Sequence, residues 1–333
     1  MTKFPRLRTP LHRLATAAVL LAALAAPAVA QPLPAGWQAV VGTRTLAPQR
    51  LTPRLPAQAA SDEGVTVRIT DASRVVTGGD DVIDIMEALG LGRLVFAAPE
   101  RSVTEAGQRA RQHFLFNRTT GAEGILSLDG TLFIGNSLRR HGKLAETLRT
   151  TGLPALVIDD VQPVPQKLRK VAAVFGLQRE GEALAQTLQT QLDAAVAVGK
   201  LLPRPPRVLH VSATGGGGKP TVGGRDTAAA QLIRLAGGIN VGDAAQAADY
   251  TALSNEGVVA AAPEVVLLTQ NDLVLLGGET GLWRSYPTLR QTPAGQNNRV
   301  WVMPDNQLKV LGTASGAGAI ALAQALRALP AAK

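Results

Sequence analysis

One short pattern occurs twice in the chain, and this repeat constrains the fold more than any single motif. Each copy opens with Glu-Gly, continues as a short apolar helix and a turn, and ends in an apolar run typical of a buried strand. The copies cover residues 123–134 and 256–267, which lie 133 residues apart. Because each copy describes one helix followed by one strand, the repeat predicts two α/β lobes of similar construction.

The first lobe opens with a strand–helix–strand pattern. A β-type run at residues 74–77 ends at two glycines, and Asp80 and Asp81 then precede apolar residues at helical spacing. Acidic side chains are favourable at a helix start, so we interpret this pair as helix-start charge rather than as paired catalytic carboxylates. The apolar run at 94–96 predicts the next strand.

Between the two copies, apolar residues recur at a spacing of three to four throughout 163–202. This spacing predicts one long helix, or two nearly collinear helices, about 45–50 Å in length. The prolines that follow end the helix, and the strand at 207–211 opens the second lobe. The predicted fold class is therefore α/β, with two Rossmann-like lobes joined by one long bridging helix. The predicted organisation is a signal peptide at 1–30, a Pro-rich irregular lead-in at 31–64, an N-terminal lobe at 65–162, the bridging helix at 163–202 and a C-terminal lobe at 203–333.

The N-terminus has the pattern of a secretory signal. A basic start precedes an apolar run at 14–26, and Ala28-Val29-Ala30 forms a cleavage site. The run is too short to cross about 30 Å of hydrocarbon as a helix. Cleavage would remove four basic residues and lower the formal net charge from +9 to +5. We therefore expect a soluble periplasmic protein.

Composition excludes several classes of function. The chain has no Cys, which excludes disulfides, thiolate metal sites and cysteine nucleophiles. Aromatic residues make up only 3%, so a nucleic acid is not an expected partner. The glycines at 215–218 precede Lys219-Pro220 and fail the phosphate-loop pattern, so we interpret them as a loop at a cleft. No nucleophile elbow or zinc-protease motif is present, and we expect no enzymatic activity. An exported α/β hydrolase and a scaffold or adhesion module remain as alternatives.

Seven segments occur in an order and spacing that is recognisable: Arg74–Gly79, Gly121–Leu128, Gly215–Gly218, Arg225–Ala230, Leu235–Asn240, Tyr250–Glu256 and Gln291–Val300. With these segments, the chain from Arg74 to Leu329 resembles the substrate-binding proteins of hemin and other iron-chelate or cobalamin ABC importers. The hemin branch is the most similar. The resemblance implies a periplasmic binding protein of the helical-backbone type, which is monomeric, has a rigid cleft and captures and delivers its ligand without catalysis.

The resemblance also implies roles for individual residues. Glu123 and Glu256, which hold matching places in the repeat, would contact arginines of the ABC permease dimer. Hemin-binding relatives carry a ligating tyrosine at the place of Thr104, which is a poor haem ligand. By analogy with relatives that use a tyrosine and a histidine, Tyr250 would ligate the iron opposite His141, or alternatively His113. His141 follows two arginines, and we expect it in a loop after the strand at 132–134.

Further residues are expected around the ligand. We expect His210 to be a core histidine on a strand. Four cations near one rim of the cleft would pair with the haem propionates: Arg101, Arg118, Arg139 and Arg140. The backbone at Gly216 and Gly217 would approach the ligand. The predicted ligand is hemin, carried as cargo rather than as a catalytic cofactor. A ferric siderophore or a cobalamin-like corrinoid is the alternative.

Overall fold

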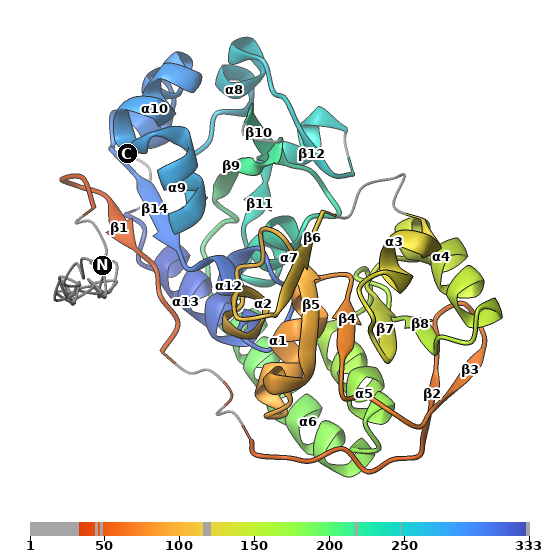
Figure 1. Cartoon of the computed structure of the whole chain (residues 1–333). Helices are drawn as coiled ribbons and strands as arrows, with labels where there is room; N and C mark the ends of the chain where they lie inside the picture. Colours follow the sequence, from red (N-terminus) through yellow and green to blue (C-terminus); the bar gives the residue numbers. More distant parts are fainter. Residues whose placement is uncertain are drawn as a thin grey trace, which may run out of the picture. The chain divides into compact units, whose positions relative to one another are not determined.

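Two mainly parallel β-sheets divide the protein into an N-terminal and a C-terminal lobe (Figure 1). The structure is a computed structural model that describes residues 33–43, 46, 49–115, 121–216, 219–246 and 248–330. The described residues from Pro34 onward pack as one unit. The α/β class with two lobes, predicted from the internal repeat, is confirmed.

The N-terminal lobe contains a five-stranded, all-parallel sheet in the order β6-β5-β4-β7-β8. Helices connect successive strands, as parallel pairing requires. Because helices cover both faces, β4, β7 and β8 are buried along their whole length. The strands are β4 (Val75–Thr77), β5 (Val95–Pro99), β6 (Gln112–Phe114), β7 (Leu132–Gly135) and β8 (Ala155–Val157). The helices are α1 (Asp80–Ala88), η1 (Gly92–Leu94), α2 (Glu105–Gln108), α3 (Ala122–Leu126) and α4 (Leu138–Thr150).

The C-terminal lobe contains a seven-stranded sheet in the order β1-β14-β13-β9-β10-β12, with β11 also paired to β9. Only β10 and β12 are antiparallel to their neighbours among these described strands. The strands are β1 (Gln38–Ala39), β9 (Arg207–Gly216), β10 (Lys219–Gly223), β11 (Ile239–Asn240), β12 (Tyr250–Thr251), β13 (Val265–Thr269) and β14 (Val300–Met303). The helices are α7 (Ala228–Leu235), η2 (Val241–Ala245), α8 (Asn255–Ala261), α9 (Gln270–Leu276), α10 (Gly278–Ser285), η3 (Pro287–Gln291), α11 (Pro293–Gln296), α12 (Asp305–Leu308) and α13 (Ser315–Arg327).

The Pro-rich lead-in is more regular than its prolines suggest. Residues 38–39 form β1, which extends the sheet of the C-terminal lobe beside β14. Farther on, β2 (Ala57–Ala60) pairs antiparallel with β3 (Thr66–Ile69) beside the N-terminal lobe. In β2 every second residue is buried, and this alternation, rather than the nearby prolines, determines the local structure. The lead-in therefore contacts both lobes.

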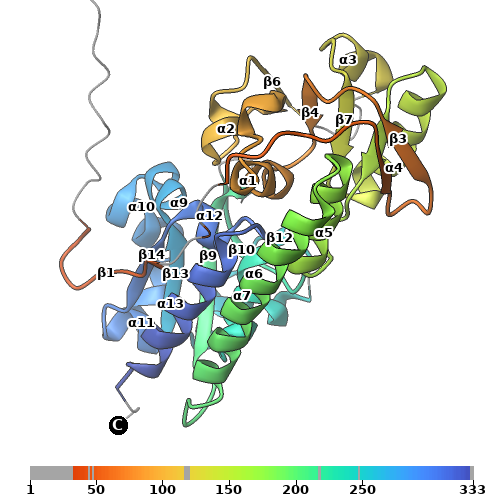
Figure 2. The ribbon, with the colours of Figure 1, turned by 90° about the horizontal axis from the view of Figure 1, so that it is seen from below.

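The bridging segment differs from both predicted forms, one long helix and two nearly collinear helices. It forms two helices, α5 (Val164–Val174) and α6 (Gln178–Gly199), because Gly176 adopts a left-handed φ of +69° and ends the first helix. The chain then turns back, so that Arg169 of α5 pairs with Glu182 of α6 at 2.6 Å. The second half of α6 packs on α13 in the C-terminal lobe (Figure 2). The bridge is thus α6 alone, whose 22 residues span about 33 Å.

A second connection between the lobes lies in the middle of α1, the first helix of the N-terminal lobe. The buried carboxylate of Asp84 accepts hydrogen bonds from the backbone N–H and the hydroxyl of Thr313, which precedes α13; the hydroxyl bond is 2.7 Å long. Asp84 and Thr313 are both at most 6% exposed. The two lobes are therefore joined at a dry contact as well as by α6.

Candidate functional site: the cleft between the lobes

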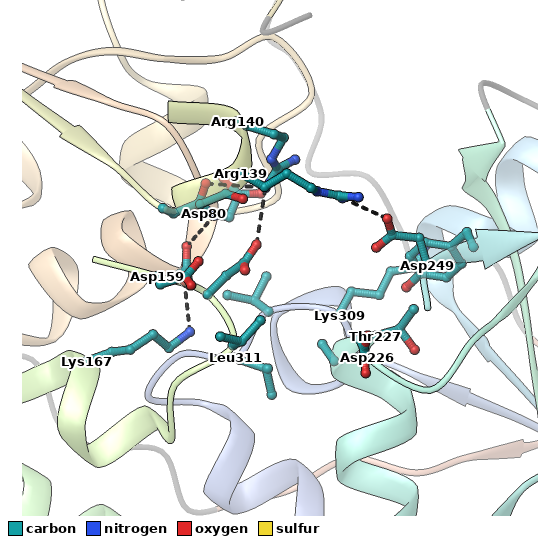
Figure 3. Close-up of a pocket in the computed structure, with 18 of the residues that line it drawn as sticks. Asp80, Arg139, Arg140, Asp159, Lys167, Asp226, Thr227, Asp249, Lys309 and Leu311 are labelled. Carbon is teal, nitrogen blue, oxygen red and sulfur yellow. Dashed lines mark hydrogen bonds and ion pairs between the residues drawn. The ribbon is translucent and has the colours of Figure 1, made fainter. Parts of the chain in front are cut away.

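A cleft of about 890 Å³ separates the two lobes, and residues of both lobes line it (Figure 3). Most of these residues follow directly after strands: Asp80 after β4, Asn136 after β7, Asn271 after β13 and Asp305 after β14. Ligands in open α/β sheets bind outside the carboxyl ends of the strands, and this cleft has that position. Its volume is in the range of small-molecule and cofactor sites.

On the wall formed by the N-terminal lobe, the first turns of α4 present two arginines. The guanidinium of Arg140 pairs with Asp160 at 3.2 Å, on the same lobe. Arg139 instead reaches across the cleft to Asp249 of the C-terminal lobe at 2.9 Å. Arg101 also lines the cleft, and it has no ion-pair partner among the described residues. Three cations predicted from the sequence are thus together at one rim.

The floor of the cleft contains a buried ion pair. Lys167 of α5 donates to the carboxylate of Asp81 at 2.8 Å, and both side chains are at most 6% exposed. The side-chain amide of Asn136 donates to the other oxygen of Asp81 at 2.9 Å. Burial, and then the charge of Asp81, raise the pKa of nearby Asp160 to about 6. Asp80 and Asp81 do open α1 as predicted, but they also line the cleft.

Tyr250 lies on the opposite wall, on the short edge strand β12. Its ring is half-buried and packs edge-on against the ring of His210, with 5.8 Å between the centroids. The ammonium of Lys309 lies 5.6 Å from the centre of the tyrosine ring. Burial raises the pKa of the Tyr250 phenol above its ordinary value, and the carboxylates of Asp272, Asp305 and Asp249 act in the same direction. Tyr250 is therefore a neutral phenol in this structure.

A polar cluster supports Tyr250 from behind. The fully buried carboxylate of Asp272 accepts from Lys309 at 2.7 Å and from Ser212 at 3.0 Å. It also accepts from the hydroxyl of Thr269 at 2.8 Å. Burial alone would raise the pKa of Asp272, but the neighbouring His210 and then the charge of Lys309 outweigh it and lower this pKa well below its usual range. His210 is fully buried on β9, as expected for a core histidine. Because Asp272 contacts Lys309, Ser212 and Thr269 at 3.0 Å or less, these buried side chains hold one another in place behind the tyrosine.

His141 is not on the cleft wall, and the expectation that it faces Tyr250 is wrong for this structure. We expected a loop after β7, but His141 belongs to α4 and shares its inner face with Leu144, Ala145 and Leu148. It is 1% exposed, and its Nδ1 accepts from the backbone N–H of Asn136 at 3.1 Å. Burial, assisted by the charge of Arg140, lowers its pKa to about 4. The alternative, His113, lies on β6 with Nε2 2.9 Å from the carbonyl oxygen of Gly107, and it does not line the cleft.

The remaining predicted residues have varied positions. Thr104 is buried and caps α2 by accepting from the backbone N–H of Gly107. Gly216 ends β9 beside Lys219 of β10. Arg118 and Gly217 lie outside the described residues. Glu123 and Glu256 are exposed in the first turns of α3 and α8, each before a buried strand. Their role remains a prediction.

Sequence reasoning missed the acidic character of the cleft. Seven aspartates and five lysines or arginines are among the described residues that line it. Among the missed residues are Asp159 and Asp160 after β8, Asp305 after β14, and Lys309. The rule that ligand-contacting residues follow parallel strands would have found the first three, since each comes within three residues of an apolar run. Lys309 has no such signal, because its place depends on its long-range partner Asp272.

Among the described residues, no group of three or more His, Asp or Glu side chains is arranged to hold a metal ion. No described helix is both long enough and apolar enough to cross a membrane.

Comparison with known proteins identifies the class of this fold. The periplasmic binding protein family matches residues 75–307. The chain therefore belongs to the periplasmic binding protein family. No curated protein sequence matches the chain.

Several solved structures are similar to this one. The periplasmic heme-binding protein RhuT from Roseiflexus sp. RS-1, in apo form, is 32% identical with a TM-score of 0.67; the match covers 77% of this chain and 98% of RhuT. The heme binding protein HmuT is 25% identical with a TM-score of 0.70, covering 88% and 98%. The periplasmic heme-binding protein BhuT, in complex with two hemes, is 29% identical with a TM-score of 0.63, covering 76% and 98%.

Proposed function

We propose that this protein is the periplasmic substrate-binding component of an ABC importer, which captures hemin between its lobes and delivers it to the permease. The observation that carries the proposal is Tyr250, a half-buried tyrosine on the cleft wall of a protein whose solved relatives bind heme. The function is capture and delivery, without chemical conversion of the ligand.

The chemistry of the cleft supports hemin as the cargo. A phenolate is a hard, anionic ligand that suits ferric iron. Since the raised pKa keeps Tyr250 as a phenol, ligation of the iron as phenolate would release the phenol proton. Aliphatic side chains on the walls, such as Val103, Val161 and Leu311, offer apolar surface for the flat macrocycle. The cations at the rim, Arg101, Arg139 and Arg140, would pair with the two propionates. We assign no role at the iron to His141, because it lies in the core.

The partner in this proposal is a dimeric permease. Glu123 and Glu256 would each meet a basic residue, because one exposed carboxylate on each lobe suits a partner with two-fold symmetry. The protein would act as a monomer after export and cleavage of residues 1–30. A ferric siderophore or a corrinoid is the other ligand class that a cleft of this kind accommodates.

The test is an optical titration of the protein from Gln31 onward with hemin, with ferrichrome and cyanocobalamin in parallel. We expect a saturable one-to-one Soret shift with hemin. Tyr250→Phe removes the ligating oxygen and is expected to abolish the high-spin charge-transfer absorption. The chain has two tyrosines, so Tyr286→Phe is a matched control. Tyr286 is 4% exposed and does not line the cleft.

Two results would contradict the proposal. Saturable binding of another chelate with no Soret shift would assign the cleft to that ligand class. An unchanged spectrum for Tyr250→Phe would exclude this tyrosine as the axial ligand.

A further inference from the structure

One ion pair in the cleft differs from the others. Lys167 pairs with Asp81 on the floor, Arg140 with Asp160 within the N-terminal lobe, and Lys309 with Asp272 within the C-terminal lobe. The pair between Arg139 of α4 and Asp249 instead crosses from one lobe to the other (Figure 3). The side chains of Arg139 and Asp249 are 73% and 66% exposed.

The position of Asp249 gives this pair a consequence for ligand binding. Arg139 is one of the cations that line the cleft, and its guanidinium already donates to a carboxylate of the protein itself, that of Asp249. Asp249 immediately precedes Tyr250, so this carboxylate lies beside the residue proposed to hold the iron. A ligand that brings its own carboxylate to Arg139 must displace Asp249 first.

The charge of the cleft increases this effect. Among the described residues that line it, aspartates outnumber lysines and arginines by seven to five, so an anionic ligand meets more acidic than basic side chains there. A displaced Asp249 carboxylate would remain near the ligand and repel it. A ligand with its carboxylates blocked would meet neither the competition nor the repulsion.

We propose that Asp249 is an internal carboxylate that competes with ligand carboxylates for Arg139, and so determines how strongly the cleft discriminates between carboxylated and uncharged porphyrins. This inference rests on the proposed function, because it takes hemin as the carboxylated ligand.

The experiment compares hemin with hemin dimethyl ester, whose propionates are blocked, in Soret titrations of four proteins: wild type, Asp249→Asn, Arg139→Gln and the double variant. Asn retains the size of Asp but not its charge. Asp249→Asn is expected to bind hemin about 2–5-fold more tightly, a small change because exposed ion pairs are weak. It is expected to leave the affinity for the ester unchanged. In the Arg139→Gln background, Asp249→Asn is expected to give a smaller gain in hemin affinity than in wild type, because the arginine for which the two carboxylates compete is gone.

A matched control separates this competition from a general effect of charge. Asp226 lies on the same wall of the cleft, and its nearest ion-pair partner is Arg225, on its own lobe. Asp226→Asn removes the same charge without touching Arg139, so the gain from Asp249→Asn must exceed its gain. The charge-transfer absorption of bound hemin must be the same in Asp249→Asn as in wild type, which shows that Tyr250 has not moved.

The outcomes distinguish the two proposals. Saturable hemin binding by wild type, with equal gains in Asp249→Asn and Asp226→Asn or an equal gain for the ester, would overturn the role of Asp249 alone. An undiminished gain in the Arg139→Gln background would do the same. Absence of hemin binding by wild type would overturn both the proposed function and this inference.

Discussion

Individual residues show how far a side chain's role follows from its neighbours in sequence. Tyr250 was predicted to lie at the cleft, and it does line it. His141 follows Arg139 and Arg140, and this polar context suggested an exposed loop. The helix, however, begins at Leu138, which directs the two arginines outward and His141 inward. A difference of one or two residues in a helix start, which sequence patterns do not resolve, decided between a ligand and a core residue.

At the same scale, Asp84 gives a prediction about pH and stability. Burial raises its pKa from 3.8 to about 6, despite the two hydrogen bonds from Thr313. Because the folded pKa exceeds the unfolded one, the stabilisation from this carboxyl is complete below about pH 4 and is lost as the pH rises through 6. Above that pH, the folded protein carries a buried charge at a penalty on the order of 2 kcal/mol.

Asp84→Asn is therefore expected to be more stable than wild type at pH 7–8, by about 1–2 kcal/mol, and equal to it near pH 4. Both bonds from Thr313 end on one oxygen of Asp84, so the amide oxygen of Asn can accept both. Asp84→Leu is the control, since it leaves the buried N–H of Thr313 without an acceptor and is expected to lose stability at every pH. Urea unfolding between pH 4 and 8 measures these differences. A pH-independent difference between Asp84→Asn and wild type would refute the interpretation.

At the scale of elements, the α5–α6 pair explains why the bridging helix, α6, is shorter than the predicted segment 163–202. The apolar spacing continues through both helices, because each buries one face, and that spacing carries no information about the turn between them. The signal was Gly176, which lies at the reversal with a positive φ, followed by Gly181, where the two helices touch. Gly181 faces Ala172 so closely that a Cβ at 181 would overlap the Ala172 methyl group.

Two glycines inside helices therefore predict opposite effects of the same substitution. Gly142 of α4 has open space where a Cβ would be added, so Gly142→Ala is expected to stabilise the protein by up to about 1 kcal/mol through helix propensity. Gly181→Ala has the same gain in propensity but overpacks the α5–α6 contact, which costs about 1–3 kcal/mol, so a net loss is expected. Ala172→Gly in the Gly181→Ala background removes the overlapping methyl group and is expected to recover part of that loss. Thermal unfolding of the variants is the measurement, and equal effects at 142 and 181 would show that the helices separate freely.

At the scale of the whole molecule, local patterns predicted the two lobes and a bridging helix between them, but not the other contacts that join the lobes. The repeat, the βαβ order and the position of the cleft follow from short segments. The connections depend on contacts far apart in the sequence: Asp84 with Thr313, β1 with β14, and Arg139 with Asp249. The lead-in shows the same limit, since Gln307 is hydrogen-bonded in both directions to the backbone of Gly42, 265 residues away.

The last prediction concerns the molecule as a carrier with two matched lobes. Glu123 and Glu256 are exposed at the starts of α3 and α8, away from the residues that line the cleft. If each meets one half of a dimeric permease, Glu123→Ala and Glu256→Ala should each weaken docking by a similar factor, on the order of 10-fold, and the double variant by more. Hemin affinity should not change, because neither carboxylate lines the cleft.

Uptake of hemin by vesicles containing the cognate permease measures docking, and the Soret titration measures ligand binding. Glu146→Ala, which removes an exposed carboxylate from α4, controls for the change in net charge. Undiminished uptake with the double variant would exclude these two residues as the docking contacts. A large effect at one site with none at the other would show that the repeat in the sequence is not used as a symmetric interface.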